Sequence, residues 1–162
     1  MSNNTTVDNL NKALQMEMSA AHQYQLHAHV LDDWGLNLLA DQMREEQAEE
    51  MVHSDTFIER ILFLKGTPEI ALAKPPKRAE TLVEMFEADL ADEEEAIEFY
   101  IKAAKQAAEA NDIGSRTLFE KIALDEEGHK SWLELQLDLI QRLGEQAYSA
   151  KFVSFPHEDA AE

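Results

Sequence analysis

Six side chains that can bind metal ions recur at matching intervals along the 162 residues of this chain. In chain order they are Glu17, Glu50, His53, Glu93, Glu126 and His129. In each set of three, the second glutamate follows the first by 33 residues and the histidine follows by three more, and the two sets are offset by 76 residues. Four carboxylates and two imidazoles, with no thiol, make a ligand set for hard-to-borderline metal ions. The repeated spacing therefore predicts a metal site built from two matching halves.

Each of the six residues stands on an apolar stripe with the three- and four-residue spacing of an amphipathic helix. Glu50 lies between Met43 and Phe57 on such a stripe, with His53 one turn further along the same side. A carboxylate on a buried face is costly unless an opposite charge compensates it, as a metal ion would. Because six ligands exceed the four of one tetrahedral zinc ion, the pattern favours two metal ions, each with one histidine and one terminal carboxylate.

The spacing assigns Glu17 to the half that contains Glu50 and His53, and Glu93 to the half that contains Glu126. Glu50 and Glu126 are the expected bridging ligands, because they face one another from the two helices that carry a Glu-x-x-His pair. Di-iron and di-manganese carboxylate proteins arrange their ligands in this way within a four-helix bundle. The alternative is a bundle whose carboxylates bind no metal. It is disfavoured because six converging ionisable groups would cost more than the net stability of a bundle.

The composition restricts the class of protein further. Only 5 Gly and 4 Pro occur among many strong helix formers, which favours helix almost throughout, and the absence of Cys excludes disulfides and thiolate metal sites. No apolar run reaches the length of a membrane span, so a cytoplasmic protein without a membrane partner is expected. The net charge of −19 argues against nucleic acid as a partner. It suits the attraction of cations, or serves only to keep the surface soluble.

The predicted fold is an all-α four-helix bundle in a single domain over residues 1–162. The expected helices cover residues 6–33, 36–65, 81–110 and 115–143, followed by a short helix at 145–152 and a mobile tail at 153–162. In each helical hairpin the midpoint between the paired glutamates falls at the expected turn, so the ligands meet at one level. About sixteen residues join the second and third helices, enough to run back along the bundle. We therefore expect a crossover, with these two helices parallel.

Three stretches carry a resemblance to a known family: LNKALQMEMSAAHQYQLHAHVLDDWGL, EEMVHSDTFIERILFLKG and LDEEGHKSWLELQLDLIQRLG. They resemble bacterioferritin, and the similarity covers nearly the whole chain apart from the long connection and the tail. The resemblance implies a ferritin-like bundle in which the six ligands form a ferroxidase centre that takes two Fe ions per subunit. It also implies that O2 or H2O2 oxidises Fe(II) there and that ferric mineral is stored in a 24-subunit shell of two-fold dimers. A ferredoxin-type protein is the implied reductant.

Met51 is next to Glu50 but lies about 100° around the helix, turned away from the core. The resemblance implies that Met51 ligates a haem b shared with the same methionine of a two-fold-related subunit, and a thioether is a suitable axial ligand. Gln25 and Arg44 stand where the family often has aromatic residues that would line the haem. The alternative role for Met51 is an apolar side chain in a dimer interface.

Tyr24 also stands at a position that matches the family, and it is the expected redox or hydrogen-bonding partner of the centre. Phe57 stands where the family commonly has a tyrosine near the site, and this difference removes one electron donor. The alternative role for Tyr24 is that of a core tyrosine whose hydroxyl bonds to Glu93. Tyr100, seven residues after Glu93 as Tyr24 is after Glu17, would bond to Glu17 in the same way.

Other polar residues near the pattern are expected on solvated or interface surfaces. Glu45 and Glu49 lie on a different face of their helix from Glu50, and form an acidic surface or hold iron on it. Three histidines of the first helix do not share a face with Glu17 and are expected at the surface or in an interface. They are His22, His27 and His29.

Two further functions compete with iron storage by a ferroxidase. One is a di-iron or di-manganese carboxylate oxidase that acts on an organic substrate, although such enzymes usually need extra helices and a substrate cavity, for which 162 residues leave little room. The other is a haem-bridged dimer that transfers electrons without storing mineral. The mass of the purified particle separates a shell from a dimer.

Overall fold

The structure is a computed structural model that describes residues 2–154, so most of the tail predicted to be mobile lies outside the described residues. The helices are α1 (Ser2–Asp33), α2 (Asn37–Phe63), α3 (Leu82–Glu109), α4 (Ile113–Leu143) and α5 (Glu145–Ser149), and a 3-10 turn follows at Ala150–Phe152. No strand occurs among the described residues. The all-α prediction is confirmed. No helix in this part of the chain has the length and apolarity needed to cross a membrane.

The ends of the first three helices explain why the chain turns where it does. Each is followed by a residue in the left-handed region, at Gly35 (φ 80), Lys65 (φ 62) and Asn111 (φ 57). The amide of the next residue then bonds to the carbonyl five residues back, at 2.8–2.9 Å, which satisfies a free carbonyl of the last helical turn. At the starts of α3 and α4, Thr81 and Asp112 accept a hydrogen bond from the backbone amide three residues on.

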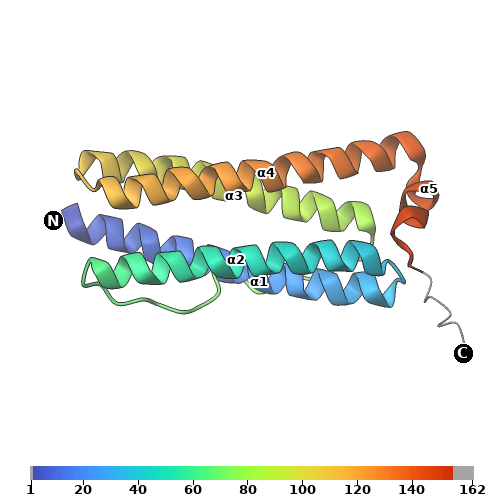
Figure 1. Ribbon diagram of the computed structural model, residues 1–162, viewed down its shortest axis with the longest axis horizontal. Helices are drawn as coiled ribbons and strands as arrows, with labels where there is room; N and C mark the ends of the chain where they lie inside the picture. The colour runs from blue at the N-terminus through green and yellow to red at the C-terminus, as the bar shows by residue number, and fades with distance from the viewer. Residues whose placement is uncertain (1, 155–162) are drawn as a thin grey trace, which may run out of the picture.

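The four long helices form two antiparallel hairpins, α1 with α2 and α3 with α4 (Figure 1). The connection between the hairpins, residues 64–81, leaves α2 at one end of the bundle and reaches α3 at the other (Figure 1). Helix α3 therefore runs parallel to α2, and the predicted crossover is confirmed. A hairpin connection would not need so long a loop.

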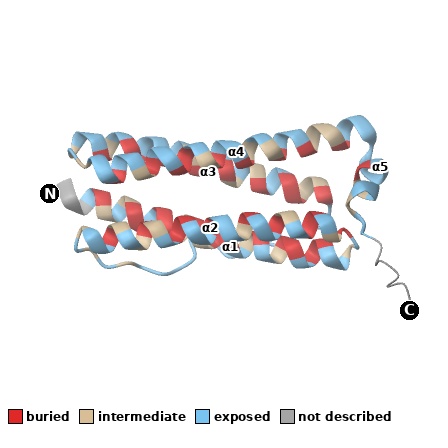
Figure 2. Ribbon diagram, viewed as in Figure 1, coloured by how far each residue is buried: buried red, intermediate tan, exposed pale blue. Residues whose placement is uncertain are grey.

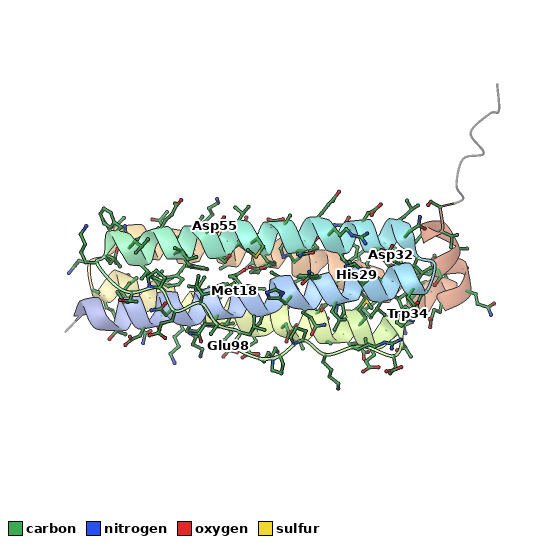
Figure 3. All side chains as sticks on the ribbon, turned by 90° about the horizontal axis from the view of Figure 1, so that it is seen from below. Met18, His29, Asp32, Trp34, Asp55 and Glu98 are labelled. Atoms are coloured by element: carbon green, nitrogen blue, oxygen red, sulfur yellow. The ribbon has the colours of Figure 1, made fainter. Side chains whose placement is uncertain are left out.

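The crossover runs along the bundle beside α1 (Figure 3), and residues spaced four apart on one face of α1 form hydrogen bonds with it. These anchoring residues are Asn11, Gln15, Ser19 and Gln23. The side chain of Ser19 accepts from the amides of Ala73 (2.7 Å) and Lys74 (3.1 Å). The Gln23 side chain likewise accepts from the Lys77 amide at 2.8 Å. Because the loop has no secondary structure of its own, this face of α1 satisfies several of its backbone groups.

Replacing Ser19 with Ala is expected to loosen the crossover without unfolding the bundle. The buried Ser19 hydroxyl accepts from the amides of Ala73 and Lys74, and a typical hydrogen bond contributes about 0.5–1.5 kcal/mol. Hydrogen exchange of the Lys74 amide should accelerate about tenfold, and that of the Ala73 amide less, because it also bonds to the Gln15 carbonyl. Ser131→Ala, at an exposed position of α4, is the control and should change neither amide. Unchanged exchange in Ser19→Ala would show that other contacts hold the loop.

The core consists of two apolar clusters at opposite ends of the bundle. One includes Leu31, Met43 and Phe86, and Tyr148 of α5 covers it; the other is built around Phe57 and Tyr100. Buried residues lie along the inner sides of the helices and exposed residues along the outer sides (Figure 2). The segment between the two clusters is filled by polar side chains instead.

The buried face of α3 does not coincide with its apolar stripe. The three- and four-residue spacing through Glu93 predicts Leu90 and Ile97 in the core, but both are only partly buried, and Asp89 and Ala96 are buried in their place. The inward face of α3 is therefore rotated slightly from the apolar stripe. Asp89 is tolerated there because it has a buried partner, His27, on α1.

Candidate metal centre

All six residues of the repeated pattern converge between the two apolar clusters, and none of them is more than 8% exposed. Their ligand atoms form two groups of four in which all atoms lie within 4.8 Å of one another. One group contains Glu17 and His53, and the other contains Glu93 and His129. Glu50 and Glu126 belong to both groups. This is the arrangement that two bridging and two terminal carboxylates require.

Both imidazoles point their Nδ1 atom into the cluster. His53 Nδ1 lies 3.2 Å from Glu17 Oε2 and 3.3 Å from Glu126 Oε1. His129 Nδ1 lies 3.0 Å from Glu126 Oε2 and 3.2 Å from Glu50 Oε1. The rings are nearly parallel, 25° apart, with their centroids 6.4 Å apart. Two metal ions would each meet one imidazole and share the carboxylates between them.

Several atoms that point into the cluster make no properly oriented hydrogen bond among the described residues, although imidazole nitrogens and carboxylate oxygens lie 3.0–3.3 Å apart there. They are Glu50 Oε1, both carboxylate oxygens of Glu126 and His129 Nδ1. Buried polar atoms without partners are costly, and buried anions more so. Cations placed among these atoms would remove that cost. The donor set thus fits a pair of metal ions.

Burial and mutual repulsion shift the ionisation of the carboxylates. Burial, with the charges of Glu17 and Glu126, raises the pKa of Glu50 well above its usual range. Burial also raises the pKa of Glu93 to about 8, although His129 opposes this shift. For His129, burial lowers the pKa but the close carboxylates, Glu126 first among them, raise it by more. Without metal, the cluster therefore retains protons that metal ions would displace.

Two tyrosines donate hydrogen bonds to the terminal carboxylates, each across the boundary between the hairpins. Tyr24 on α1 donates to Glu93 Oε1 on α3 at 2.5 Å. Tyr100 on α3 donates to Glu17 Oε1 on α1. Burial and the nearby carboxylates raise the pKa of both phenols well above the usual value. Both hydroxyls therefore stay protonated and act as donors that orient the carboxylates.

A second layer of carboxylates contacts the outward nitrogen of each imidazole, and sequence reasoning missed it. His129 Nε2 lies 3.0 Å from Glu46 Oε2 and 3.3 Å from Glu49 Oε2, and His53 Nε2 lies 3.2 Å from Asp125 Oδ2. Carboxylates in this position fix the orientation of a metal-binding histidine. Glu49 and Asp125 are themselves 76 residues apart, so the repeat contained a signal for them. Spacing did not indicate Glu46, because its neighbour Gln47 is the residue that continues the four- and three-residue spacing from Met43 to Glu50.

The expectation that His27 lies at the surface or in an interface is wrong. Its side chain is 1% exposed, and its Nδ1 lies 3.0 Å from Asp89 Oδ2. Its Nε2 lies 2.8 Å from the side chain of Gln23. Burial raises the pKa of Asp89 to about 6, although His27 opposes this shift. Sequence spacing could not reveal this pair, because its members lie on different helices outside the repeat.

The metal-free protein should lose stability as the pH rises from 6 to 8. Unfolded Glu93 releases its proton near pH 4.5 but folded Glu93 only near pH 8, so the folded state binds more protons over this range. Stability then falls with rising pH, by up to about 1.4 kcal/mol per pH unit for one such group. Thermal unfolding of chelator-treated protein at pH 6, 7 and 8 measures the effect.

Glu93→Gln is the matched control for this pH dependence, because the amide is close in shape and does not titrate. The fall in unfolding temperature between pH 6 and 8 should be smaller in the variant than in the unaltered chain. An equal fall in both proteins would show that Glu93 is ionised in the folded state throughout. Mn²⁺ should offset the loss, since metal binding strengthens as the ligands lose protons.

Known proteins share both the sequence and the fold of this chain. Residues 7–143 match the Ferritin family, described as a ferritin-like domain. The bacterioferritin of Rhodobacter capsulatus is 43% identical over 143 residues, which cover 88% of this chain and 89% of that protein. The bacterioferritin of Mycolicibacterium paratuberculosis is 42% identical over 91% of this chain and 92% of that protein.

Solved structures agree with these relatives. The structure of Rhodobacter capsulatus bacterioferritin, described with a metal-free dinuclear site and haem iron, is similar at a TM-score of 0.90 and 41% identity over 96% of each chain. Mycobacterium tuberculosis bacterioferritin BfrA gives a TM-score of 0.89 at 40% identity over 92% of this chain and 94% of that one. The chain therefore belongs to the bacterioferritin family of iron-storage proteins.

Proposed function

We propose that this protein is an iron-storage ferroxidase that oxidises Fe(II) at the buried cluster and stores the ferric product in a 24-subunit shell. The observation that carries the proposal is the pair of overlapping ligand groups that share Glu50 and Glu126. One metal ion would be held by Glu17 and His53, and the other by Glu93 and His129, with the shared carboxylates between them. Iron is the substrate of this site, whether or not some of it stays bound.

The ligand set favours oxidation of iron in pairs. Two Fe(II) ions supply two electrons, which with two protons reduce O2 to H2O2, or H2O2 to two water molecules. The four carboxylates balance the charge of two Fe(II) ions and favour Fe(III) still more, because their negative charge stabilises the higher oxidation state. Tyr24 and Tyr100 hold the terminal carboxylates in place through their hydroxyls.

The cavity that reaches the cluster argues against an organic substrate. It has a volume of about 130 Å³ and is lined by Glu17, Glu50, Glu93 and Glu126 among other residues. Pockets for drug-sized ligands typically have about 300–1,000 Å³. The smaller space suits metal ions, water, O2 or H2O2. An oxidase for organic molecules is therefore not favoured.

Assembly into a shell is supported by family membership. Large apolar side chains are exposed on different sides of the bundle, including Val52 and Phe63 on α2, Ile70 on the crossover and Leu124 on α4. Because single exposed apolar side chains are normal on protein surfaces, they add no support of their own. Ferric mineral would collect inside the shell, and a ferredoxin-type protein is the proposed reductant for its release.

Glu50→Ala and His129→Ala should each abolish the fast phase of Fe(II) oxidation while the shell still assembles. Each change removes a proposed metal ligand, and Glu50 belongs to both ligand groups. Stopped-flow absorbance after addition of two Fe(II) per subunit in air measures the rate, and particle mass measures assembly. Glu45→Ala, at an exposed position of α2, should keep the unaltered rate. Unaltered rates in both site variants would refute the assignment.

We further propose that Met51 binds a haem b between two subunits. Its side chain is 39% exposed on α2, outside the bundle core, where its thioether is accessible to a partner. When bound, the haem would supply one-electron transfer to or from the stored iron. Near this face, Gln25 bonds to His22, and Arg44 pairs with Asp32 rather than offering an aromatic surface. The methionine is thus the residue on which haem binding would depend.

Met51→Leu should remove the haem without disturbing the ferroxidase centre, because leucine preserves the apolar volume and removes the sulfur ligand. The Soret absorbance of the purified shell should disappear, while the rate of Fe(II) oxidation stays within about twofold. Met18→Leu, at a partly buried position of α1, is the control and should retain the absorbance. A Soret band that survives Met51→Leu would assign the haem to another ligand.

A further inference from the structure

The cavity that reaches the cluster connects it with the surface between α1 and α3. Its buried end is formed by residues that include Glu50 and Glu126, each 1% exposed. Its outer end is formed by Lys74 of the crossover and by Asp92 and Glu95 of α3. The side chains of Lys74 and Glu95 are 54% and 69% exposed. The volume of about 130 Å³ is enough for several water molecules.

We call the outer end of this cavity the entrance, and one cluster of ion pairs spans it. The ammonium group of Lys74 contacts Asp92 Oδ1 and lies 4.0 Å from Glu95 Oε2. It joins the crossover, which is attached to α1, to the surface of α3. Among the described residues that line the cavity, Lys74 alone carries a positive charge, against six carboxylates. Its charge is therefore the main electrostatic obstacle to a cation at this point.

The Lys74 side chain can leave the entrance without movement of the loop. Its backbone amide bonds to Ser19 Oγ, as does that of Ala73, so the main chain is fixed to α1. The ammonium group, in contrast, is held only by half-exposed ion pairs. Such pairs are worth about 0–1 kcal/mol, which a divalent cation can outcompete at the same carboxylates.

The carboxylates at the buried end of the cavity attract a cation from the entrance toward the cluster. Glu50 Oε1 and both oxygens of Glu126 are fully buried and make no properly oriented hydrogen bond among the described residues. Glu50 and Glu126 line the same cavity whose entrance Asp92 and Glu95 form. A cation released from the entrance thus moves toward a stronger and less hydrated set of ligands.

We propose that Asp92 and Glu95 form a transient entrance site for divalent metal ions, with the Lys74 ammonium as the resident counter-ion that each metal ion displaces. This inference rests on the proposed function, because the entrance site would supply metal ions to the ferroxidase cluster through this cavity. It assigns Lys74 a role in the rate of metal entry and none in ligation at the cluster. Affinity at the cluster is then independent of Lys74.

Binding of Co²⁺ to the assembled, iron-free protein tests the proposal by a readout other than oxidation. Stopped-flow absorbance of the visible Co²⁺ bands reports arrival at the cluster. At low ionic strength, Lys74→Met should accelerate binding about three- to tenfold, in the range of electrostatic effects on association. The amount of Co²⁺ bound at equilibrium should be unchanged. The difference between the proteins should shrink at high salt, where charges are screened.

Lys77→Met is the matched control, because Lys77 is exposed on the same crossover, loses the same charge and does not line this cavity. Acceleration in Lys74→Met alone supports the entrance site. Equal rates in all three proteins, or equal acceleration in both variants, would overturn it. If the unaltered protein binds no Co²⁺ at the cluster, the proposed function itself fails, which separates that result from failure of the entrance site.

Discussion

The burial of four carboxylates and two imidazoles in one layer of the bundle is the constraint on which the rest of the structure depends. Each of these groups is at most 8% exposed, and the layer separates two apolar clusters that would otherwise form one core. Ionisable groups in such a layer destabilise the fold unless protons, hydrogen bonds or cations compensate them. Tyrosine hydroxyls donate to Glu93 and Glu17, and outer carboxylates contact the histidines, whereas Glu50 Oε1 and both oxygens of Glu126 make no properly oriented hydrogen bond among the described residues.

The two halves of the site share their ligands but not their surroundings. Glu46, which contacts His129, corresponds through the 76-residue offset to Ile122, so the other histidine has no buried carboxylate at this point. His27 corresponds in the same way to Ala103, which belongs to an apolar cluster. Since neighbouring carboxylates alter the basicity of a metal-binding histidine, the two proposed metal positions differ in their chemical surroundings. Exchange of one metal ion for another need not occur equally at both.

Much of the fold and the inner ligand set could be predicted from the sequence, because spacing encodes both. A glutamate pair whose midpoint falls on a turn places both members at one depth, and Pro75 and Pro76 exclude a helix in the long connection. The His27–Asp89 pair and the attachment of the crossover to Ser19 could not be predicted in this way. They depend on which faces of different helices meet, and periodicity along one helix does not contain that information.

Each hairpin donates a tyrosine hydrogen bond to the terminal glutamate of the other, which indicates how a protein with this pattern could arise. Tyr24 serves the carboxylate of the second hairpin and Tyr100 that of the first, so neither hairpin supplies the donor for its own terminal ligand. A solitary hairpin with this pattern would be complete only when docked against a copy of itself about a two-fold axis. The chain is thus equivalent to a fused homodimer. The crossover links the two hairpins covalently, whereas two separate hairpins would have to associate from solution.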